Sequence, residues 1–318
     1  FELLGDPLHH LLKCLHVDGY AHLFEHIMFE GSKHHNRSHF EPLQKVGANL
    51  NGSTTTDRTN YWEDLPSNHL ELALWLEADR MGFLLDAMDQ KSFDVQRDVV
   101  KNERRQSYEN QPYGMSTIQL QGSLYPAPHP YHWPTIGFHE DLDIATLEDA
   151  RSFFLQFYHP SNASIALAGD FQENVAIDLV NKYFGDLNPG QNISRFKQTD
   201  SGLDGFVDYV TYDKVLLPRL CLAWPAVPRF SPDEAPLSVL ASILADGRSS
   251  RLYRSLVYKQ RIAQSVNAFH SPSEIAGDFE VVATASEGQN VQQIEDTIHA
   301  EIAHLQSTPP SPREMQRI

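Results

Sequence analysis

Cysteine, long apolar runs and positive charge are all scarce in this sequence. The 318 residues include two cysteines, Cys14 and Cys221, which are too few for a disulfide framework and do not indicate a redox compartment. No run of 18 apolar residues occurs, so no membrane span is expected. The formal net charge is −17, which argues against nucleic acid as the main partner. An acidic surface suits cationic ligands, but more often it serves only solubility.

The rest of the composition is typical of a folded protein of about two domains. Hydrophobic residues make up 41% of the chain and charged residues 21%, so each half can bury a core. The order of strand and helix patterns predicts an α+β architecture that returns in the second half. We expect an N-terminal domain over 1–188, a polar linker over 189–208 and a second, incomplete domain over 209–318.

Residue patterns predict the individual elements. Apolar spacing of three and four predicts helices at 20–30, 69–86, 92–110 with Ser92 as cap, 145–158, 173–187, 235–246, 249–260 and 290–306. Runs of β-forming residues predict strands at 49–65, 163–171, 215–224, 263–271 and 277–286, of which 163–171 is expected to be buried. A short helix is expected within the first 18 residues, where no ligand spacing distinguishes a metal cluster of His9, His10, Cys14 and His16.

The segment AHLFEHIMFEG places two histidines one helical turn apart. Each residue of a helix advances about 100°, so His26 lies about 40° round from His22 and both imidazoles can reach one metal. Glu25 lies about 60° from His22, where it can hold a water more easily than serve as a third ligand. Two imidazoles and a distant carboxylate leave a position open for water, the catalytic form of a zinc site. A neighbouring carboxylate can take a proton from that water.

The third ligand has to come from another part of the sequence. Glu103, in VVKNERRQS, shares a partly apolar stripe with Val99 and Val100, and an acid in such a place favours a cationic partner. The alternatives are a surface glutamate paired with a basic neighbour, and a solvent-facing helix with idle histidines. With 16 histidines present, the bare H-x-x-E-H pattern arises by chance in about one such sequence in twenty.

HLFEH, followed 77 positions after its second histidine by the glutamate of VVKNERRQ, resembles the inverted zinc motif of the pitrilysin-type metallopeptidases. This family includes insulin-degrading enzyme and the mitochondrial processing peptidase. Further segments are similar to family segments: GANLNGSTTTDRTNYWEDLP, LELALWLEADRM, FYHPSNASIALAGDF, RLCLAWPA and DGRSSRLYRSLV. The resemblance covers about residues 19–318 and points to the short bacterial, processing-peptidase-like members. It implies two similar lobes, each a mixed, mostly antiparallel sheet packed with helices.

The resemblance also implies functional roles. It implies that His22, His26 and Glu103 bind Zn²⁺ and that Glu25 is the base of an endopeptidase cleaving extended or unfolded peptides in a closed chamber. It implies that substrate adds as an extra strand to the edge strand around Asn51, Gly52, Ser53 and Thr54. Backbone pairing at a sheet edge accepts many peptide sequences, with Asn51 holding the peptide through its amide. From the sequence alone, an ordinary polar strand is an equal alternative.

The sequence departs from the family pattern in three ways. Gln96 stands where many relatives carry a second glutamate; it can still orient a ligand by a hydrogen bond but brings no charge. Val257 and Gln264 stand where relatives carry an arginine and a tyrosine thought to hold the substrate, so we expect a homologous partner subunit to supply that pair. Both ends of the chain look truncated, because the strand pair usual before the zinc helix and the end of the second lobe are not recognised.

Two alternatives to an active peptidase remain, a non-catalytic scaffold subunit and an inactive fragment. Scaffold relatives usually have a degraded zinc motif, whereas all four residues of the motif are present in this sequence. Bacterial relatives are often exported, which implies a periplasmic or otherwise exported location. No leader sequence is visible in support of it, so location, natural substrate and partner identity stay open.

Overall fold

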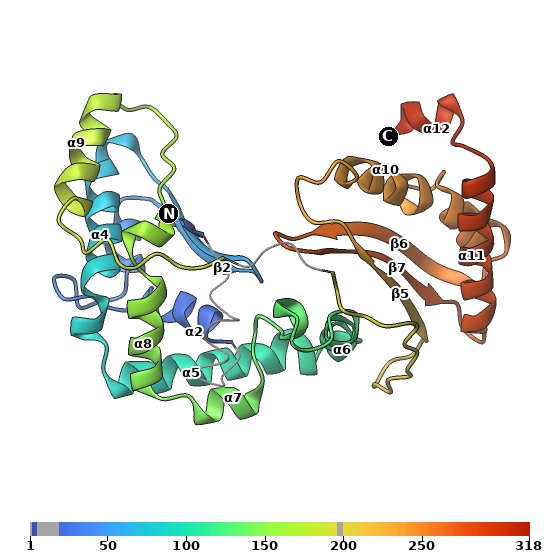
Figure 1. Cartoon of the computed structure of the whole chain (residues 1–318), viewed down its shortest axis with the longest axis horizontal. Coiled ribbons are helices and arrows are strands. Elements are labelled where there is room, and N and C mark those ends of the chain that lie inside the picture. Colours follow the sequence, from blue (N-terminus) through green and yellow to red (C-terminus); the bar gives the residue numbers. More distant parts are fainter. Residues whose placement is uncertain (1, 5–18, 196–199) are drawn as a thin grey trace. The chain divides into compact units, whose positions relative to one another are not determined.

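The computed structural model of the chain describes residues 2–4, 19–195 and 200–318 (Figure 1). These residues form two compact units. Unit 1 comprises the chain up to residue 109 together with 133–196, and unit 2 comprises 110–132 together with 197–318. Among the described helices, none is both long and apolar enough to cross a membrane.

The segment 110–132, which the sequence placed in the first domain, belongs to unit 2. Two tyrosine hydroxyls hold it there. The hydroxyl of Tyr113 donates to the backbone oxygen of Leu217 at 2.7 Å. The hydroxyl of Tyr131 accepts from the backbone N–H of Ile275 at 3.0 Å. Because both bonds join residues more than 100 positions apart, no local sequence pattern predicts this assignment.

Unit 1 contains a four-stranded antiparallel sheet in the order β2-β3-β1-β4. Its strands are β1 (Glu2–Leu4), β2 (Asn49–Thr54), β3 (Arg58–Asp64) and β4 (Ala163–Ser164). The prediction of one or two strands over 49–65 is confirmed as the β2–β3 hairpin. In this order β2 lies at an edge of the sheet, so one side of its backbone is free of a strand partner among the described residues.

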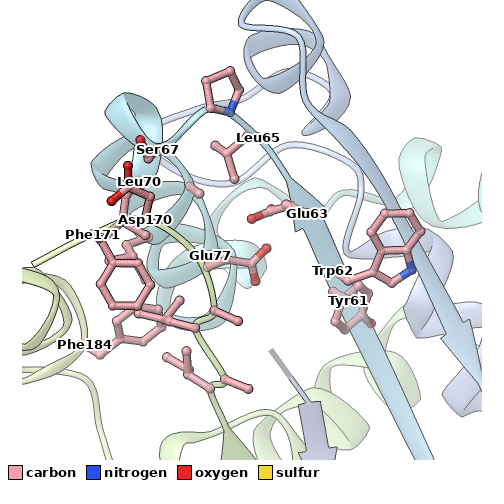
Figure 2. A pocket seen from close by; sticks show the side chains of 18 residues that line it. Tyr61, Trp62, Glu63, Leu65, Ser67, Leu70, Glu77, Asp170, Phe171 and Phe184 are labelled. Carbon is pink, nitrogen blue, oxygen red and sulfur yellow. The ribbon is translucent and has the colours of Figure 1, made fainter. Parts of the chain in front are cut away.

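The prediction of a buried strand over 163–171 is wrong beyond Ser164. Only two residues of β4 pair with β1, and residues 165–171 are irregular and partly or fully exposed. A strand needs a neighbouring ladder to satisfy its backbone, and the described part of β1 is too short to offer one. A cavity of about 200 Å³ lies between β3 and this segment, with Glu63 and Glu77 on its wall (Figure 2).

Unit 1 also contains several helices (Figure 1). They are α2 (Tyr20–Ile27), α3 (Phe40–Lys45), α4 (Leu70–Ala87), α5 (Gln90–Arg104), α7 (His139–Ile144), α8 (Leu147–Phe157) and α9 (Glu173–Phe184). Short 3₁₀ turns occupy Ser67–His69 and Pro160–Asn162, and a π-helical turn, Arg105–Glu109, continues α5. The helices expected at 20–30, 69–86, 92–110, 145–158 and 173–187 are confirmed, although α2 ends three residues before residue 30. The short helix expected within the first 18 residues lies outside the described residues, apart from 2–4.

The sequence misplaced the cap of α5. The cap is Asp89, whose side chain accepts from the backbone N–H of Ser92, while the Ser92 hydroxyl accepts from the backbone N–H of Asp89. Ser92 is therefore the third helical residue of a reciprocal capping box. The apolar stripe on α5 is also narrower than expected, because Val100 is fully buried whereas Val99 is 40% exposed.

Helix α2 is held tightly in unit 1. Its N-terminal cap is Gly19, where φ is +88° and an added Cβ would lie 2.8 Å from the Cα of Gly137. Both the backbone conformation and the space therefore require glycine. Phe24 is fully buried, with its ring centroid 5.0 Å from that of Phe153 and 5.4 Å from that of Tyr158. This aromatic packing fixes the face of α2 that turns away from the histidines.

Unit 2 contains a three-stranded antiparallel sheet in the order β5-β7-β6, with helices α10 and α11 packed on it (Figure 1). Its elements are α6 (Gly114–Leu124), β5 (Arg219–Ala226), α10 (Glu234–Ala245), β6 (Ala263–Pro272), β7 (Gly277–Ala285), α11 (Val291–Ser307) and α12 (Pro312–Arg317). Two short turns complete it, 3₁₀ at Pro130–His132 and π-helical at Tyr253–Lys259. Strand β7 alternates strictly between buried and half-buried residues, as expected for a sheet covered on one face.

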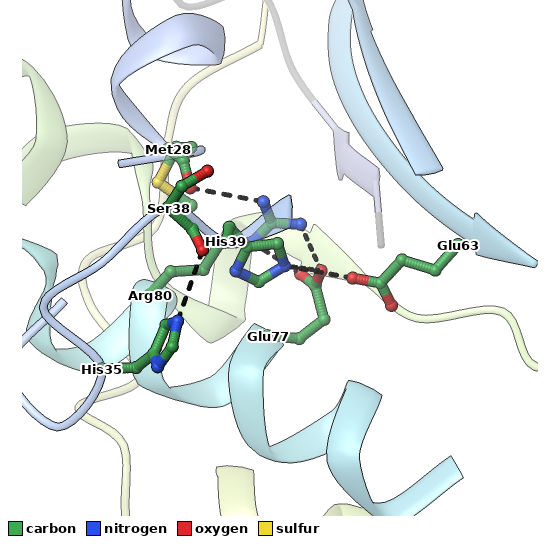
Figure 3. A network of polar contacts seen from close by, with 7 residues as sticks. All are labelled: Met28, His35, Ser38, His39, Glu63, Glu77 and Arg80. Atoms are coloured by element: carbon green, nitrogen blue, oxygen red, sulfur yellow. Dashed lines mark hydrogen bonds and ion pairs between the residues drawn. The ribbon is translucent and has the colours of Figure 1, made fainter. Parts of the chain in front are cut away.

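An ion network in the interior of unit 1 joins α3, β3 and α4 (Figure 3). Arg80 is 1% exposed and donates through Nε to Glu77 Oε2 at 3.0 Å. Its guanidinium lies 4.4 Å from the ring centroid of Tyr61. His39 Nε2 lies 3.2 Å from Glu63 Oε1 and 3.5 Å from Glu77 Oε1. The carboxylates of Glu63 and Glu77 thus both contact the imidazole of His39, and Glu77 also pairs with Arg80.

This crowding changes the acidity of Glu63. Burial, together with the charge of the neighbouring Glu77, raises the pKa of Glu63 from 4.5 to about 9. Glu63 therefore keeps its proton in the folded protein at neutral pH, whereas the unfolded chain loses it above about pH 4.5. Between these two values the folded state binds more protons than the unfolded state, so the free energy of unfolding falls as the pH rises.

We expect Glu63→Gln to remove this loss, since glutamine keeps a hydrogen-bond donor but does not ionise. The free energy of unfolding of the variant minus that of the wild type should be larger at pH 8 than at pH 5. The increase is at most about 1.4 kcal/mol per pH unit. Urea midpoints at the two pH values measure the gain, with the exposed Glu41→Gln as control. An equal difference between variant and wild type at both pH values would contradict the assigned protonation.

Candidate metal centre

Helices α2 and α5 bring together the three residues that the sequence predicted as ligands. Nε2 of His22 lies 3.7 Å from Glu103 Oε2, and Nε2 of His26 lies 3.2 Å from the same oxygen. A tetrahedral zinc about 2.0–2.1 Å from each donor would separate donor atoms by about 3.3 Å. Both distances to Glu103 are close to this value, and the ligand atoms of all three residues lie within 4.8 Å of one another. The side chains of His22 and His26 are only 12% and 23% exposed, so they do not belong to a solvent-facing helix.

Burial sets the protonation of both imidazoles. It lowers the pKa of His22 to about 4, and neighbouring His26 adds to the effect. Burial also lowers the pKa of His26, although the carboxylate of Glu103 opposes the shift. Both rings are therefore neutral at pH 7, which is the form of histidine that coordinates a metal. The side chain of Glu103 is 40% exposed, so the site is accessible to solvent.

Glu25, on the same turn of α2, lies against strand β2. Its carboxylate accepts a hydrogen bond from Thr54 Oγ1 at 2.6 Å through Oε2. On the other side, a Cβ added to Gly52 would lie 2.9 Å from Oε1, so glycine allows the strand to approach the carboxylate closely. Burial raises the pKa of Glu25, the bond from Thr54 lowers it, and the charge of Glu103 raises it. A raised pKa suits a group that takes up and releases a proton.

The four residues of β2 predicted to bind substrate divide into two pairs. Gly52 and Thr54 face Glu25, as described above. The side chains of Asn51 and Ser53 are exposed on the other face of the strand. Asn51 Oδ1 accepts from the backbone N–H of Gly52 at 2.9 Å, and Ser53 Oγ donates to Asn60 Oδ1 at 2.5 Å. The structure therefore brings one pair to the base and leaves the other pair on the exposed face.

The remaining predicted positions lie away from the three ligands. Among the described residues, the side chain of Gln96 donates to Glu30 Oε1 at 2.5 Å and makes no hydrogen bond to a ligand. In unit 2, Val257 packs against the apolar core, and Gln264 is exposed at a bulge in β6. Neither Val257 nor Gln264 offers a positive charge or a phenol.

Sequence reasoning missed two groups of residues. One is the contact of Thr54 with Glu25, for which no signal exists because the two residues are 29 positions apart. The other is the set His39, Glu63 and Glu77, whose possible ligand atoms lie within 4.8 Å of one another. Only the i, i+3 spacing of Glu77 and Arg80 on α4 could have indicated part of it. Because Arg80 already pairs with Glu77, this second set is an internal ion network.

Comparisons with known proteins identify the family of the chain. The family described as "Insulinase (Peptidase family M16)" matches residues 16–121, which include His22, Glu25, His26 and Glu103. The family described as "Peptidase M16 inactive domain" matches residues 145–318. The chain is 30% identical over 297 residues to the zinc protease PqqE of Helicobacter pylori, covering 90% of this chain and 65% of that protein. It is 24% identical over 290 residues to the uncharacterized zinc protease YmxG of Bacillus subtilis, covering 91% and 69%.

The fold is similar to that of solved structures. A crystal structure of a protease from Helicobacter pylori superimposes with a TM-score of 0.84 at 27% identity, covering 94% of this chain and 72% of that one. The chain thus spans about two thirds to three quarters of the proteins it matches. On the evidence of both the sequence matches and the fold, the chain belongs to the M16 peptidase family.

Proposed function

We propose that this chain is the zinc-bearing subunit of an endopeptidase. The observation that carries the proposal is the convergence of His22 Nε2, His26 Nε2 and Glu103 Oε2, with Glu25 one helical turn from the first histidine. Two neutral imidazoles and one carboxylate form a donor set that zinc peptidases use. The family relatives described above are themselves named zinc proteases.

Each side chain has a distinct part in the proposed reaction. Zinc, when bound by His22, His26 and Glu103, lowers the pKa of water and polarises a peptide carbonyl. Thr54 occupies Oε2 of Glu25, so Oε1 is the oxygen available to accept a proton from the attacking water. Glu25 then delivers that proton to the leaving amine as the peptide bond breaks. The raised pKa of Glu25 supports both transfers.

The free edge of β2 supports peptides in extended form as the substrate class. Strand β2 pairs only with β3 in the described sheet, and its Gly52 and Thr54 lie against Glu25. A peptide that adds to this edge would pair through its backbone and pass beside the base. Recognition of backbone rather than side chains favours extended or unfolded peptides of varied sequence. The exposed amide of Asn51 would hold such a peptide after giving up its bond to Gly52.

Unit 2 supports the need for a second subunit. Val257 is packed in the core and Gln264 is exposed at the β6 bulge, so neither can hold a substrate carbonyl or an oxyanion. We therefore include in the proposal a homologous partner that supplies an arginine and a tyrosine. The same two positions, and the match to an inactive domain over residues 145–318, favour a second candidate function, that of a non-catalytic scaffold subunit. Zinc binding separates the two.

The first test is metal content. The purified chain should bind one zinc per molecule, and Glu103→Gln should weaken binding by more than about a hundredfold, because loss of a ligand costs more than loss of a group that only orients one. Competition with a chromophoric chelator measures the affinity. Glu41→Gln, at an exposed glutamate paired with Lys45, should leave it unchanged. A wild-type chain without stoichiometric zinc would favour the scaffold.

The second test addresses the base. Glu25→Gln should retain zinc and lower the cleavage of an extended, fluorescence-quenched peptide by about a hundredfold or more, since general base catalysis contributes about 10²–10⁴. Glutamine keeps the size of the side chain and can still accept from Thr54, so folding should be preserved. The same assay on Glu41→Gln controls for the loss of a negative charge. Cleavage at the wild-type rate would show that another group is the base.

The third test addresses the partner. The isolated chain loaded with zinc should cleave the peptide slowly, because its own residues 257 and 264 cannot stabilise the developing oxyanion. Adding an M16 subunit that carries the arginine and tyrosine but lacks H-x-x-E-H should raise the rate by about a hundredfold or more. A subunit with both residues changed to alanine is the control. Full activity of the isolated chain would remove the partner from the proposal.

A further inference from the structure

Four side-chain hydroxyls lead from the interior of unit 1 to the carboxylate of Glu25. Thr54 Oγ1 lies 2.6 Å from Glu25 Oε2 and 3.1 Å from Thr59 Oγ1. Thr59 also interacts with the side chain of Tyr158, whose pKa it lowers, and the hydroxyl of Tyr158 lies 3.0 Å from the hydroxyl of Tyr61. We name these four groups, from Tyr61 through Tyr158 and Thr59 to Thr54, the hydroxyl row.

The carboxylate of Glu25 fixes the direction of the two threonine hydrogen bonds in the hydroxyl row. An ionised carboxylate has no hydrogen, so Thr54 must donate to Glu25. A hydroxyl has one hydrogen, so Thr59 has to donate to Thr54. The hydrogens of both threonine hydroxyls therefore point toward the carboxylate. Hydrogen bonds arranged in such a series polarise and strengthen one another.

The side chains that carry the hydroxyl row are held in place by packing. Thr59, Tyr61 and Tyr158 are between 1% and 4% exposed. The ring of Tyr61 lies under the guanidinium of Arg80 at 4.4 Å. The ring of Tyr158 stacks on that of Phe154 at a centroid distance of 5.2 Å. A donor on a fixed ring or a β-branched side chain loses little freedom when it bonds, so it defines the position of its acceptor well.

We propose that the hydroxyl row positions the base: it holds Oε2 of Glu25 and leaves Oε1 to accept the proton. This inference rests on the proposed peptidase function. Gly52 lies next to the other carboxylate oxygen, Oε1, which a larger residue at this position would displace. In this proposal the four hydroxyls are positioning residues, because they act on the reaction through Glu25. Geometry of this kind matters because a base misplaced by about 1 Å costs about a hundredfold in rate.

The alternative is that these hydroxyls merely satisfy one another in the core, as buried polar groups normally do. If the hydroxyls had only a structural role, removing one would change the free energy of unfolding alone. A positioning role would change kcat with KM and zinc affinity unaltered, and the conservative Thr54→Ser would restore the rate that Thr54→Val loses. The two roles can therefore be separated by kinetics on variants that keep the shape of each side chain.

The kinetic arm compares such variants in the zinc-loaded enzyme with its partner subunit. Thr54→Val should lower kcat by about tenfold or more, because it removes a charge-assisted hydrogen bond. Thr54→Ser should stay within about threefold of the wild type, and Tyr158→Phe should lower kcat by about two- to fivefold. Two controls remove a hydroxyl elsewhere: Tyr183→Phe, which bonds to Glu71 on the surface, and Thr297→Val on α11. Equal rates for Thr54→Val and the controls would overturn the proposal.

The second arm needs neither zinc nor activity. A double-mutant cycle of Tyr158→Phe and Glu25→Ala, read from urea midpoints of the metal-free chain, should be non-additive, because the row loses its acceptor in one variant and a donor in the other. An additive cycle would overturn the row beyond Thr54. If the cycle is non-additive but the chain cleaves no peptide with any partner, the hydroxyl row is supported and the peptidase function is rejected. Failure of the hydroxyl row can therefore be told apart from failure of the proposed function.

Discussion

The packing of helix α2 between α5 and β2 is the constraint on which the site depends. One face of α2 is fixed by the aromatic cluster around Phe24 and by the close approach of Gly19 to Gly137. The opposite face then has one orientation, in which His22 and His26 meet a carboxylate from α5. Protein interiors are close-packed, so a helix anchored in this way cannot rotate without opening the core. The geometry of the candidate metal site therefore depends on the packing of the apolar face of α2 as much as on the residues of its polar face.

Burial changes the protonation of side chains at two places in unit 1. At the candidate site it keeps two imidazoles neutral and raises the pKa of Glu25. In the nearby ion network it leaves Glu63 protonated, because two carboxylates and one arginine cannot all stay charged away from water. Arg80 connects the two regions, since it pairs with Glu77 and lies over the ring at the start of the hydroxyl row. The environment of the base therefore extends well into the core.

The two units differ in what they contribute to the proposed chemistry. Unit 1 contains His22, His26 and Glu103, the proposed ligands, together with Glu25, the proposed base, and the free edge of β2. Unit 2 has a well-packed sheet and helices, but its Val257 and Gln264 provide no group that binds an oxyanion. This asymmetry agrees with the separate matches to a peptidase domain and to an inactive domain. A division of labour between chains is a consistent interpretation of such a protein.

The sequence by itself determined the features that depend on short spacing. The histidines one turn apart, the β2–β3 hairpin and most helices follow from local periodicity, and Glu103 was identified with the help of family resemblance. Tertiary structure decided the rest: the place of 110–132 in unit 2, the irregular course of 165–171, and the contact of Thr54 with Glu25. These depend on partners tens of residues away. A strand forms only beside another strand, and a hydroxyl orients a carboxylate only where the fold brings the two together.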